Sequence, residues 1–201
     1  MGSNYRAEVP LRIECPCEEF VLQIEGRADG ILEEDSMVVV DEIKGVLSSL
    51  EYISKPVGVH LAQAKCYAYI YARQRELKQI GIQMTYCQIE TEEIKRFREL
   101  FEFEALEAWF LKLVAAYEKW ARFQTRWRTV RNLSIKECEF PFAYREGQRD
   151  LVSSVYRTIL RKKKLFIQAP TGVGKTMATV FPAVRAVGEG LGEKIFYLTA
   201  R

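Results

Sequence analysis

The segment that most restricts how this chain can fold is a glycine-rich loop near its C-terminal end. Residues 168–176 read Gln-Ala-Pro-Thr-Gly-Val-Gly-Lys-Thr. The spacing of apolar residues predicts a strand over 165–169, a helix over 176–187 and a second strand over 195–199. A strand, a loop, a helix and a strand in this order form a β-loop-α-β unit, which implies a parallel sheet.

The composition of the loop suits a phosphate ligand. Gly172 and Gly174 allow backbone N–H groups to curl around an anion without interference from a side chain. Lys175 can reach the β- and γ-phosphates of a nucleotide, and the Thr176 hydroxyl can hold Mg²⁺. The helix that follows directs its positive end toward the anion. Ala169 replaces the first glycine of the usual pattern. The competing interpretation is a glycine-containing turn, which the flanking strand and helix disfavour.

This loop and its surroundings resemble superfamily-two helicases, particularly the XPD-like (DinG-like) DNA helicases. Residues 144–148, Tyr-Arg-Glu-Gly-Gln, lie about one helix upstream, as the adenine-reading motif does in those proteins, and residues 196–201 look like the opening of the next motif. The resemblance implies ATP as a ligand. The residues that it implies for nucleotide binding are Gln148, which would contact the base, with Thr171, Gly172, Val173, Gly174, Lys175 and Thr176, of which Thr176 would also bind the metal. The carboxylates that complete such a motor do not follow, so we expect nucleotide binding but no unwinding from this chain alone.

A different pattern precedes the loop. Alternating and β-branched residues predict strands, and apolar residues at helical spacing predict helices. The expected strands cover 8–15, 20–32, 37–46, 83–90 and 94–101, and the expected helices cover 59–77, 103–131 and 146–163. Residues 132–143 are expected to form a linker, with the boundary near residue 140. The chain is therefore predicted to hold two domains of the α/β class, over 1–140 and 141–201.

Charged residues in the first part form a second candidate site. Alternate residues of a strand share a face, so Glu42 and Lys44 are expected to point one way and Asp41 the other. If a hairpin turns at residues 35–36, Asp29 falls opposite Glu42, with the two Cβ atoms about 5 Å apart. Facing carboxylates repel each other, and a divalent cation bound by oxygen ligands would offset that repulsion.

The remaining residues of this candidate site are polar groups suited to phosphodiester chemistry. Lys44 could position or help deprotonate an attacking water, or stabilise the charge that grows on a phosphate. Gln63 and Tyr67 are four residues apart and lie on one helix face, where they could orient the lysine or a DNA phosphate. The competing interpretation is a ladder of ion pairs on an exposed sheet face.

The pattern of Gly26-x-x-Asp29, Asp41-Glu42-Ile-Lys44 and Gln63-x-x-x-Tyr67 resembles the PD-(D/E)xK nucleases, specifically their RecB-like branch. The resemblance implies a restriction-endonuclease-like αβ module, followed here by the first βαβ unit of a RecA-like P-loop domain. It implies Mg²⁺ or Mn²⁺ held by Asp29, Glu42 and the Ile43 carbonyl, and catalytic roles for Asp29, Glu42, Lys44, Gln63 and Tyr67. RecB-like nucleases usually begin with a helix that supplies a further ligand, whereas this chain begins almost directly on a strand. His60 is expected to start a helix and not to replace that ligand.

Composition excludes several other classes of protein. No apolar run approaches the roughly 20 residues that span a bilayer, and no secretory signal is recognisable. Five cysteines and one histidine fit neither a disulfide framework nor a zinc site, and they favour the cytoplasm. The net charge is only +3, but residues 119–131 interleave basic residues with Trp120, Phe123 and Trp127. This stretch could follow a nucleic-acid backbone, although we favour an amphipathic helix with its aromatic side chains in the core.

The leading hypothesis is therefore a DNA-repair type of enzyme: metal-dependent hydrolysis of DNA by the first module, coupled to an ATP-driven helicase. The expected partners are ATP and single-stranded or forked DNA, without a membrane. A second hypothesis is a DNA-binding module that no longer cuts, which the missing upstream helix favours. A third is a P-loop ATPase unrelated to DNA, against which the basic and aromatic stretch argues weakly.

Overall fold

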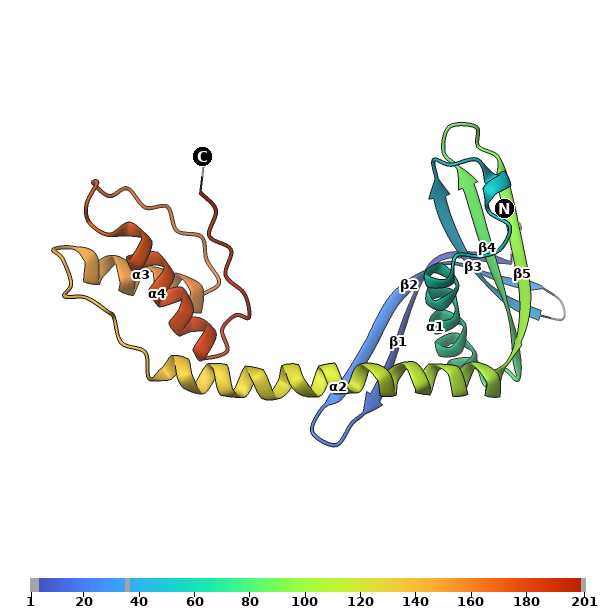
Figure 1. The fold of residues 1–201 in the computed structure, drawn as a ribbon, viewed down its shortest axis with the longest axis horizontal. Coiled ribbons are helices and arrows are strands. Elements are labelled where there is room, and N and C mark those ends of the chain that lie inside the picture. Colours follow the sequence, from blue (N-terminus) through green and yellow to red (C-terminus); the bar gives the residue numbers. More distant parts are fainter. Residues whose placement is uncertain (1–3, 35–36, 200–201) are drawn as a thin grey trace. The chain divides into compact units, whose positions relative to one another are not determined.

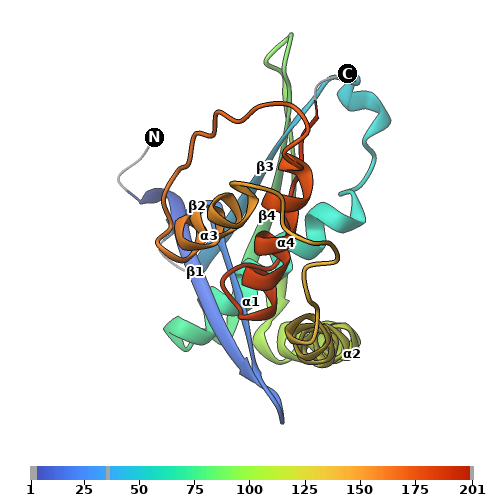
Figure 2. The ribbon, with the colours of Figure 1, turned by 90° about the vertical axis from the view of Figure 1, so that its left-hand side faces the viewer.

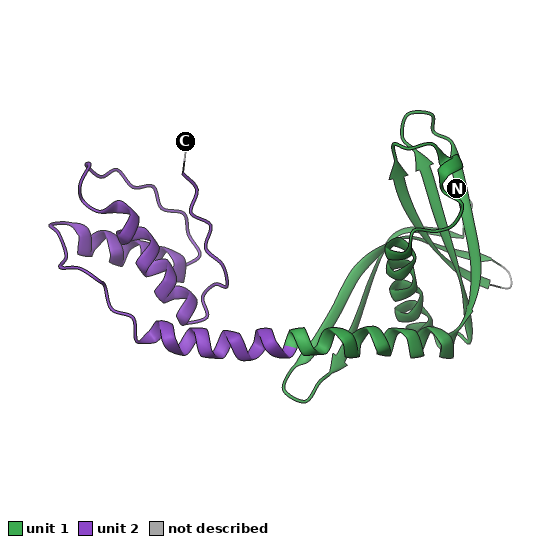
Figure 3. Ribbon diagram, in the orientation of Figure 1, with its two compact units in different colours: residues 1–121 green, residues 122–201 purple. Residues whose placement is uncertain are grey.

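The computed structural model describes residues 4–34 and 37–199. The chain forms two compact units, residues 1–121 and residues 122–201, which are coloured separately in Figure 3. The division between the units falls inside one long helix. The assignment of 1–140 and 141–201 to a nuclease-like and a helicase-like domain stays a prediction.

The first unit is built on a sheet of mixed direction. Among the described residues the sheet has five strands in the order of the sequence: β1 (Tyr5–Pro16), β2 (Val21–Glu34), β3 (Met37–Val46), β4 (Gln79–Gln88) and β5 (Ile94–Glu102). Neighbouring strands are antiparallel except β3 and β4, which are parallel. A parallel pair needs a crossover connection, and here it consists of a short 3₁₀ turn, η1 (Leu50–Tyr52), and the helix α1 (Gly58–Arg75) (Figure 1).

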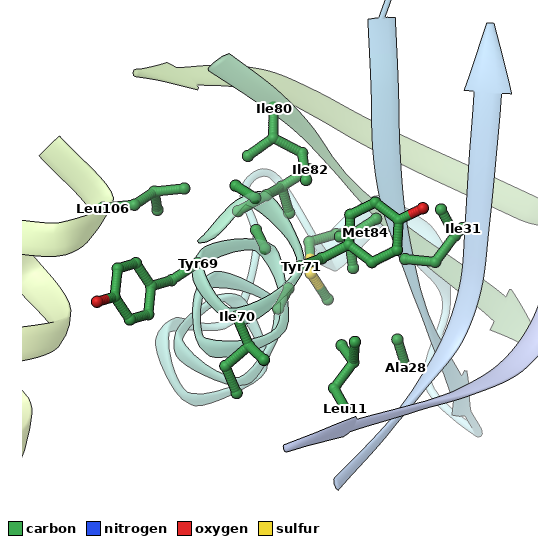
Figure 4. Close-up of a cluster of buried hydrophobic side chains, with 14 of the residues drawn as sticks. Leu11, Ala28, Ile31, Tyr69, Ile70, Tyr71, Ile80, Ile82, Met84 and Leu106 are labelled. Carbon is green, nitrogen blue, oxygen red and sulfur yellow. The ribbon is translucent and has the colours of Figure 1, made fainter. Parts of the chain in front are cut away.

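The core of this unit lies between α1 and the sheet. One turn of α1 is buried on every side, since Tyr69, Ile70, Tyr71 and Ala72 are all buried. Figure 4 shows Tyr69, Ile70 and Tyr71 among Leu11, Ala28 and Ile31 from the hairpin and Ile80, Ile82 and Met84 from β4. The helix α2 (Phe103–Lys136) adds Leu106 and Phe110, and the Phe110 ring stacks on Tyr69 with the ring centroids 4.3 Å apart.

The predicted strands and helices of the first unit are present with small shifts at their ends. The return arm expected over 94–101 is β5, which pairs antiparallel with β4. The largest difference is in α2, which continues to Lys136 through the first residues of the expected linker. Packing of the aromatic residues on α2 was predicted wrongly. Trp120, Phe123 and Trp127 are 58%, 61% and 54% exposed, because the described residues place no partner for a core on that face.

The second unit contains the end of α2 and two further helices, α3 (Gln148–Leu160) and α4 (Lys175–Gly188). The Arg185 guanidinium donates to the Lys136 carbonyl at 2.8 Å and so ties α4 to the end of α2. The strands expected over 165–169 and 195–199 are not formed, and both segments run irregularly (Figure 2). Phe166 and Phe196 are 92% and 82% exposed. A strand needs a neighbour to bond its N–H and C=O groups, and neither segment is paired in a ladder with another described segment.

None of the helices in the described part of the chain is long and apolar enough to cross a membrane.

Candidate functional site

β3 and α1 bring four of the predicted site residues into one hydrogen-bonded chain. The Lys44 ammonium lies 2.6 Å from Glu42 Oε1 and 3.1 Å from Gln63 Oε1, to both of which it donates. Gln63 in turn donates from Nε2 to the Tyr67 hydroxyl at 3.2 Å. Glu42 and Lys44 can meet because residues two apart in a strand share a face. Gln63 and Tyr67 can meet because residues four apart in a helix share a face.

Tyr67, the last residue in this series of hydrogen bonds, packs against Gly26 of the β1–β2 hairpin. A Cβ atom at Gly26 would lie 2.7 Å from the Tyr67 hydroxyl, so any other residue there would force the tyrosine side chain to shift. Glycine therefore allows the tyrosine to approach the backbone of β2. The Gly26-x-x-Asp29 pattern placed this glycine beside the site without giving this reason for it.

Glu42 is the most confined residue of the candidate site. Its side chain has no exposed area, and its Oε2 atom has no hydrogen-bond partner among the described residues. Burial raises the pKa of the Glu42 carboxyl, while the hydrogen bond from Lys44 lowers it and the nearby charge of Asp29 raises it again. A buried carboxylate oxygen without a partner is costly, so the position favours either a proton or a cation.

Asp29 stands beside Glu42 in the register expected from the sequence. The described pairs of β2 and β3 run from Gly30 with Asp41 to Glu34 with Met37, and the next rung would join residues 29 and 42. The expected turn at 35–36 lies outside the described residues. Asp29 Oδ2 accepts the Ile43 N–H at 2.8 Å. In a strand the N–H and C=O of one residue point toward the same edge, so the Ile43 carbonyl also points toward the β2 side.

Asp41 points away from this group, as alternation requires. Its carboxylate accepts from the Thr85 hydroxyl at 2.6 Å and from the Tyr5 hydroxyl at 3.5 Å. Burial raises the pKa of Tyr5, and the negative charges of Asp41 and Asp29 raise it further. Tyr5 and Thr85 were not predicted, because their meeting depends on strand pairing that the sequence pattern does not specify.

The residues of the candidate site fit a hard cation only with help from other ligands. The free oxygen of Glu42, the Asp29 carboxylate and the Ile43 carbonyl are the kind of oxygen ligand that Mg²⁺ and Mn²⁺ prefer. No group of three or more His, Cys, Asp or Glu side chains that could hold a metal occurs in 4–34 and 37–199. His60 lies 3.3 Å from the Tyr86 hydroxyl, and burial lowers its pKa. The three oxygen groups would therefore leave several coordination positions to water or substrate.

The glycine-rich loop has the backbone expected of an anion-binding turn. Gly172 and Gly174 both have positive φ, 85° and 77°, and α4 begins directly after Gly174 at Lys175. The Lys175 ammonium donates to the Ala169 carbonyl at 2.9 Å and to the Pro170 carbonyl at 2.8 Å. Thr176 Oγ1 lies 3.3 Å from the Tyr197 hydroxyl. Of the other predicted loop residues, Thr171 is exposed and Val173 is half-buried.

Gln148 contacts this loop directly. Its side chain is only 4% exposed; Nε2 donates to the Gly174 carbonyl at 3.3 Å, and Oε1 accepts from the Arg145 backbone N–H at 3.1 Å. The Arg145 guanidinium also donates to the Gly172 carbonyl. Residues 144–148 therefore clamp the loop. Arg145 belongs to the motif over 144–148 but was not predicted as a site residue. The predicted contact between Gln148 and an adenine base stays a prediction.

Comparison with known proteins concerns mainly this last part of the chain. Residues 148–200 match the family model of DEAD/DEAH box helicases. A Methanocaldococcus jannaschii protein named "Probable ATP-dependent helicase MJ0942" is 43% identical over 51 residues, which are 25% of this chain and 8% of that protein. These matches support a helicase superfamily, and the family model places the helicase segment over residues 148–200. The chain thus matches only a small part of this curated relative.

One solved structure, described as "Crystal structure of SSO0001", is similar to part of the chain, with 22% sequence identity and a TM-score of 0.38. The similarity covers 51% of this chain and 46% of that one. A likeness at this level carries no argument about the fold or the function of this chain.

Proposed function

We propose that the chain is part of an ATP-dependent DNA-processing enzyme in which a metal-dependent nuclease module precedes an XPD-like (DinG-like) helicase motor. The observation that carries the nuclease part is the continuous contact from Glu42 through Lys44 and Gln63 to Tyr67, beside Asp29. A ladder of surface ion pairs would be solvated, whereas Glu42 is wholly buried with one oxygen unpaired.

The roles of the side chains follow from this geometry. A divalent cation held by Asp29, Glu42 and the Ile43 carbonyl would supply Lewis-acid chemistry toward a phosphate. Lys44 is only partly exposed, and its ammonium can donate to a phosphate oxygen as negative charge grows there. Gln63 Oε1 accepts a hydrogen bond from the Lys44 ammonium and so fixes the direction of its other N–H groups, and Gln63 is held in turn by the hydrogen bond that it donates to Tyr67.

The ATP-binding part of the proposal rests on the helicase match over 148–200 and on the loop geometry. Positive φ at two glycines followed at once by a helix is the arrangement that receives phosphates in P-loop proteins. Gln148, Thr171, Val173 and Lys175 would line the nucleotide, and Thr176 would hold its Mg²⁺. Single-stranded or forked DNA, a role in DNA repair and a cytoplasmic location belong to the same proposal.

The nuclease part is tested by metal binding and cleavage together. We expect Mn²⁺ titrated into the chain in a calorimeter to bind the parent and the Lys44→Ala variant, but not the Asp29→Asn, Glu42→Gln double variant. On labelled single-stranded DNA the parent should cut, and neither the Lys44→Ala variant nor the double variant should. Glu25→Gln is the matched control, because it removes an exposed carboxylate of the same strand. Equal Mn²⁺ binding by the parent and the double variant would contradict the proposal.

A second candidate function is DNA binding without cleavage. It is favoured by the lack of a third acidic or histidine ligand in the part of the chain that the structure describes. The same experiment separates the two functions. Mn²⁺ binding and DNA binding by the parent, with no cleavage at any Mn²⁺ concentration, would favour the non-cutting module.

A further inference from the structure

The hairpin of β1 and β2 is interrupted once along its length. Ala7 pairs with Gly30 and Val9 pairs with Ala28, yet the intervening residues, Glu8 and Asp29, do not pair in the described hairpin. The register is the same on both sides, so no residue is inserted in either strand. Glu8 has a φ of 52°, a left-handed conformation that is unfavourable for a residue with a Cβ atom.

Both strands exchange their inner and outer faces at this interruption. On one side of it, Leu11 and Ala28 pack into the core under α1. On the other side, Ile31 is in the core and its pairing partner Arg6 donates to the Tyr71 hydroxyl of α1. Figure 4 shows Leu11, Ala28 and Ile31 together in this core. Ala28 and Ile31 are three residues apart, and strict alternation would put them on opposite faces.

The exchange of faces decides where the Asp29 carboxylate lies. Continued alternation from Ala28 would turn Asp29 to the outer face, away from Glu42. Instead, Asp29 Oδ2 accepts the Ile43 N–H, beyond the last described β2–β3 pair, Gly30 with Asp41. The carboxylate thus takes the place of the backbone acceptor that a further rung of the ladder would provide.

We propose that Glu8 is a positioning residue, whose left-handed backbone conformation aims Asp29 at the edge of β3 beside Glu42. The inference rests on the proposed function only where it concerns a metal. The side chain of Glu8 is largely exposed and pairs with the exposed Arg27 at 3.3 Å, a contact that contributes little. The backbone of Glu8 carries the effect, so residues that tolerate positive φ can replace it.

The test compares replacements of Glu8 that accept or resist positive φ in the full 201-residue chain. The first readout is hydrogen exchange of the Ile43 amide, which needs no metal; the second is Mn²⁺ affinity by calorimetry. We expect Glu8→Gly to keep the slow exchange of the Ile43 amide and the Mn²⁺ affinity of the parent. Glu8→Val, whose β-branched side chain resists this conformation, should speed Ile43 exchange as Asp29→Ala does and weaken Mn²⁺ binding by about tenfold or more. Adding Asp29→Ala to Glu8→Val should then cause little further loss.

Controls separate this effect from loss of the ion pair or of the fold. Arg27→Ala removes the contact with Glu8 and should leave both readouts unchanged. If Glu8→Val does not fold, Glu8→Ala replaces it in the test. We then expect a smaller increase in Ile43 exchange and a smaller loss of Mn²⁺ affinity. Slow Ile43 exchange in Glu8→Val, or fast exchange in Glu8→Gly, would overturn the inference. Absence of Mn²⁺ binding by the parent would reject the proposed function, while Ile43 exchange would still decide the role of Glu8.

Discussion

At the scale of single residues, the chemistry of the first unit centres on Glu42. A carboxylate with no exposed area is rare in a folded domain unless something compensates its charge. Lys44 satisfies one of its oxygens, and the other has no partner among the described residues. A buried oxygen without a partner is unfavourable for stability by itself, and the cation of the proposed function would offset that cost.

The raised pKa of Glu42 predicts how stability depends on pH. In the folded chain Glu42 keeps its proton to a higher pH than in the unfolded chain. Its contribution to the free energy of unfolding therefore falls as the pH rises through the folded pKa. Glu42→Gln should be more stable than the parent above that pKa, and the difference should shrink as the pH is lowered toward the usual glutamate range. Urea unfolding between about pH 4 and about pH 8 measures it.

The opposite result would assign a different role to the ion pair. If the difference between Glu42→Gln and the parent grows as the pH falls, Glu42 is stabilised as a carboxylate by Lys44, and burial is not the dominant effect. Saturating Mn²⁺ provides a second check, because it should stabilise the parent and not the variant if Glu42 binds the cation.

At the scale of elements, the start of α4 depends on two glycines that differ in their surroundings. Both have positive φ, which disfavours any side chain. A Cβ atom at Gly174 would also lie 2.4 Å from Gln148 Nε2, whereas a Cβ atom at Gly172 would meet nothing within 4 Å. Gly174 is therefore required for the clamp that Gln148 forms on the loop as well as for the turn itself.

This difference predicts unequal effects of two alanine substitutions. Gly172→Ala should cost about 1 kcal/mol through its backbone conformation alone. Gly174→Ala should cost more, because the Gln148 side chain must also move. The Ala178 N–H bonds to the Gly174 carbonyl at 3.0 Å and is a local probe, so its amide exchange should accelerate most in Gly174→Ala. Equal acceleration in the two variants would mean that the contact with Gln148 does not restrain the loop.

At the scale of the whole molecule, the two units differ in how completely their backbone groups are paired. In the first unit, β4 lies between two neighbours and α1 covers a core that extends from Leu11 to Phe110. In the second unit, α3 and α4 have regular hydrogen bonds, but the segments 165–169 and 195–199 do not. A neighbouring strand would pair their backbone N–H and C=O groups, and a second layer packed on the sheet would cover their exposed apolar side chains.

Hydrogen exchange along the chain should reproduce this contrast. We expect slow exchange in β3, β4 and α1, and fast exchange over 165–169 and 195–199, because amides without a hydrogen-bond partner exchange quickly. The matched comparison inside the second unit is α4, whose amides should exchange at an intermediate rate. Uniformly strong protection from Leu165 to Leu198 would show that the segments are paired in solution.

The sequence by itself determined what depends on local spacing. Alternation along β3 put Glu42 and Lys44 on one face and Asp41 on the other, and a four-residue interval put Gln63 and Tyr67 on one face of α1. The register that places Asp29 next to Glu42 followed from counting residues on either side of a turn. Periodicity carries this information because side chains project in directions set by the backbone of their own element.

Only the tertiary structure decided what depends on partners distant in the chain. The residues around Glu8 and Asp29 do not predict that both strands exchange their inner and outer faces there. The exchange depends on how the two strands pair on either side of these residues. The apolar pattern of residues 165–169 favours a strand, yet no described strand pairs with this segment. The aromatic residues of α2 have the spacing of residues that pack into a core, yet their side chains are exposed. Such outcomes depend on whether a second surface is present, because hydrogen bonds between strands and burial of apolar area both require two participants.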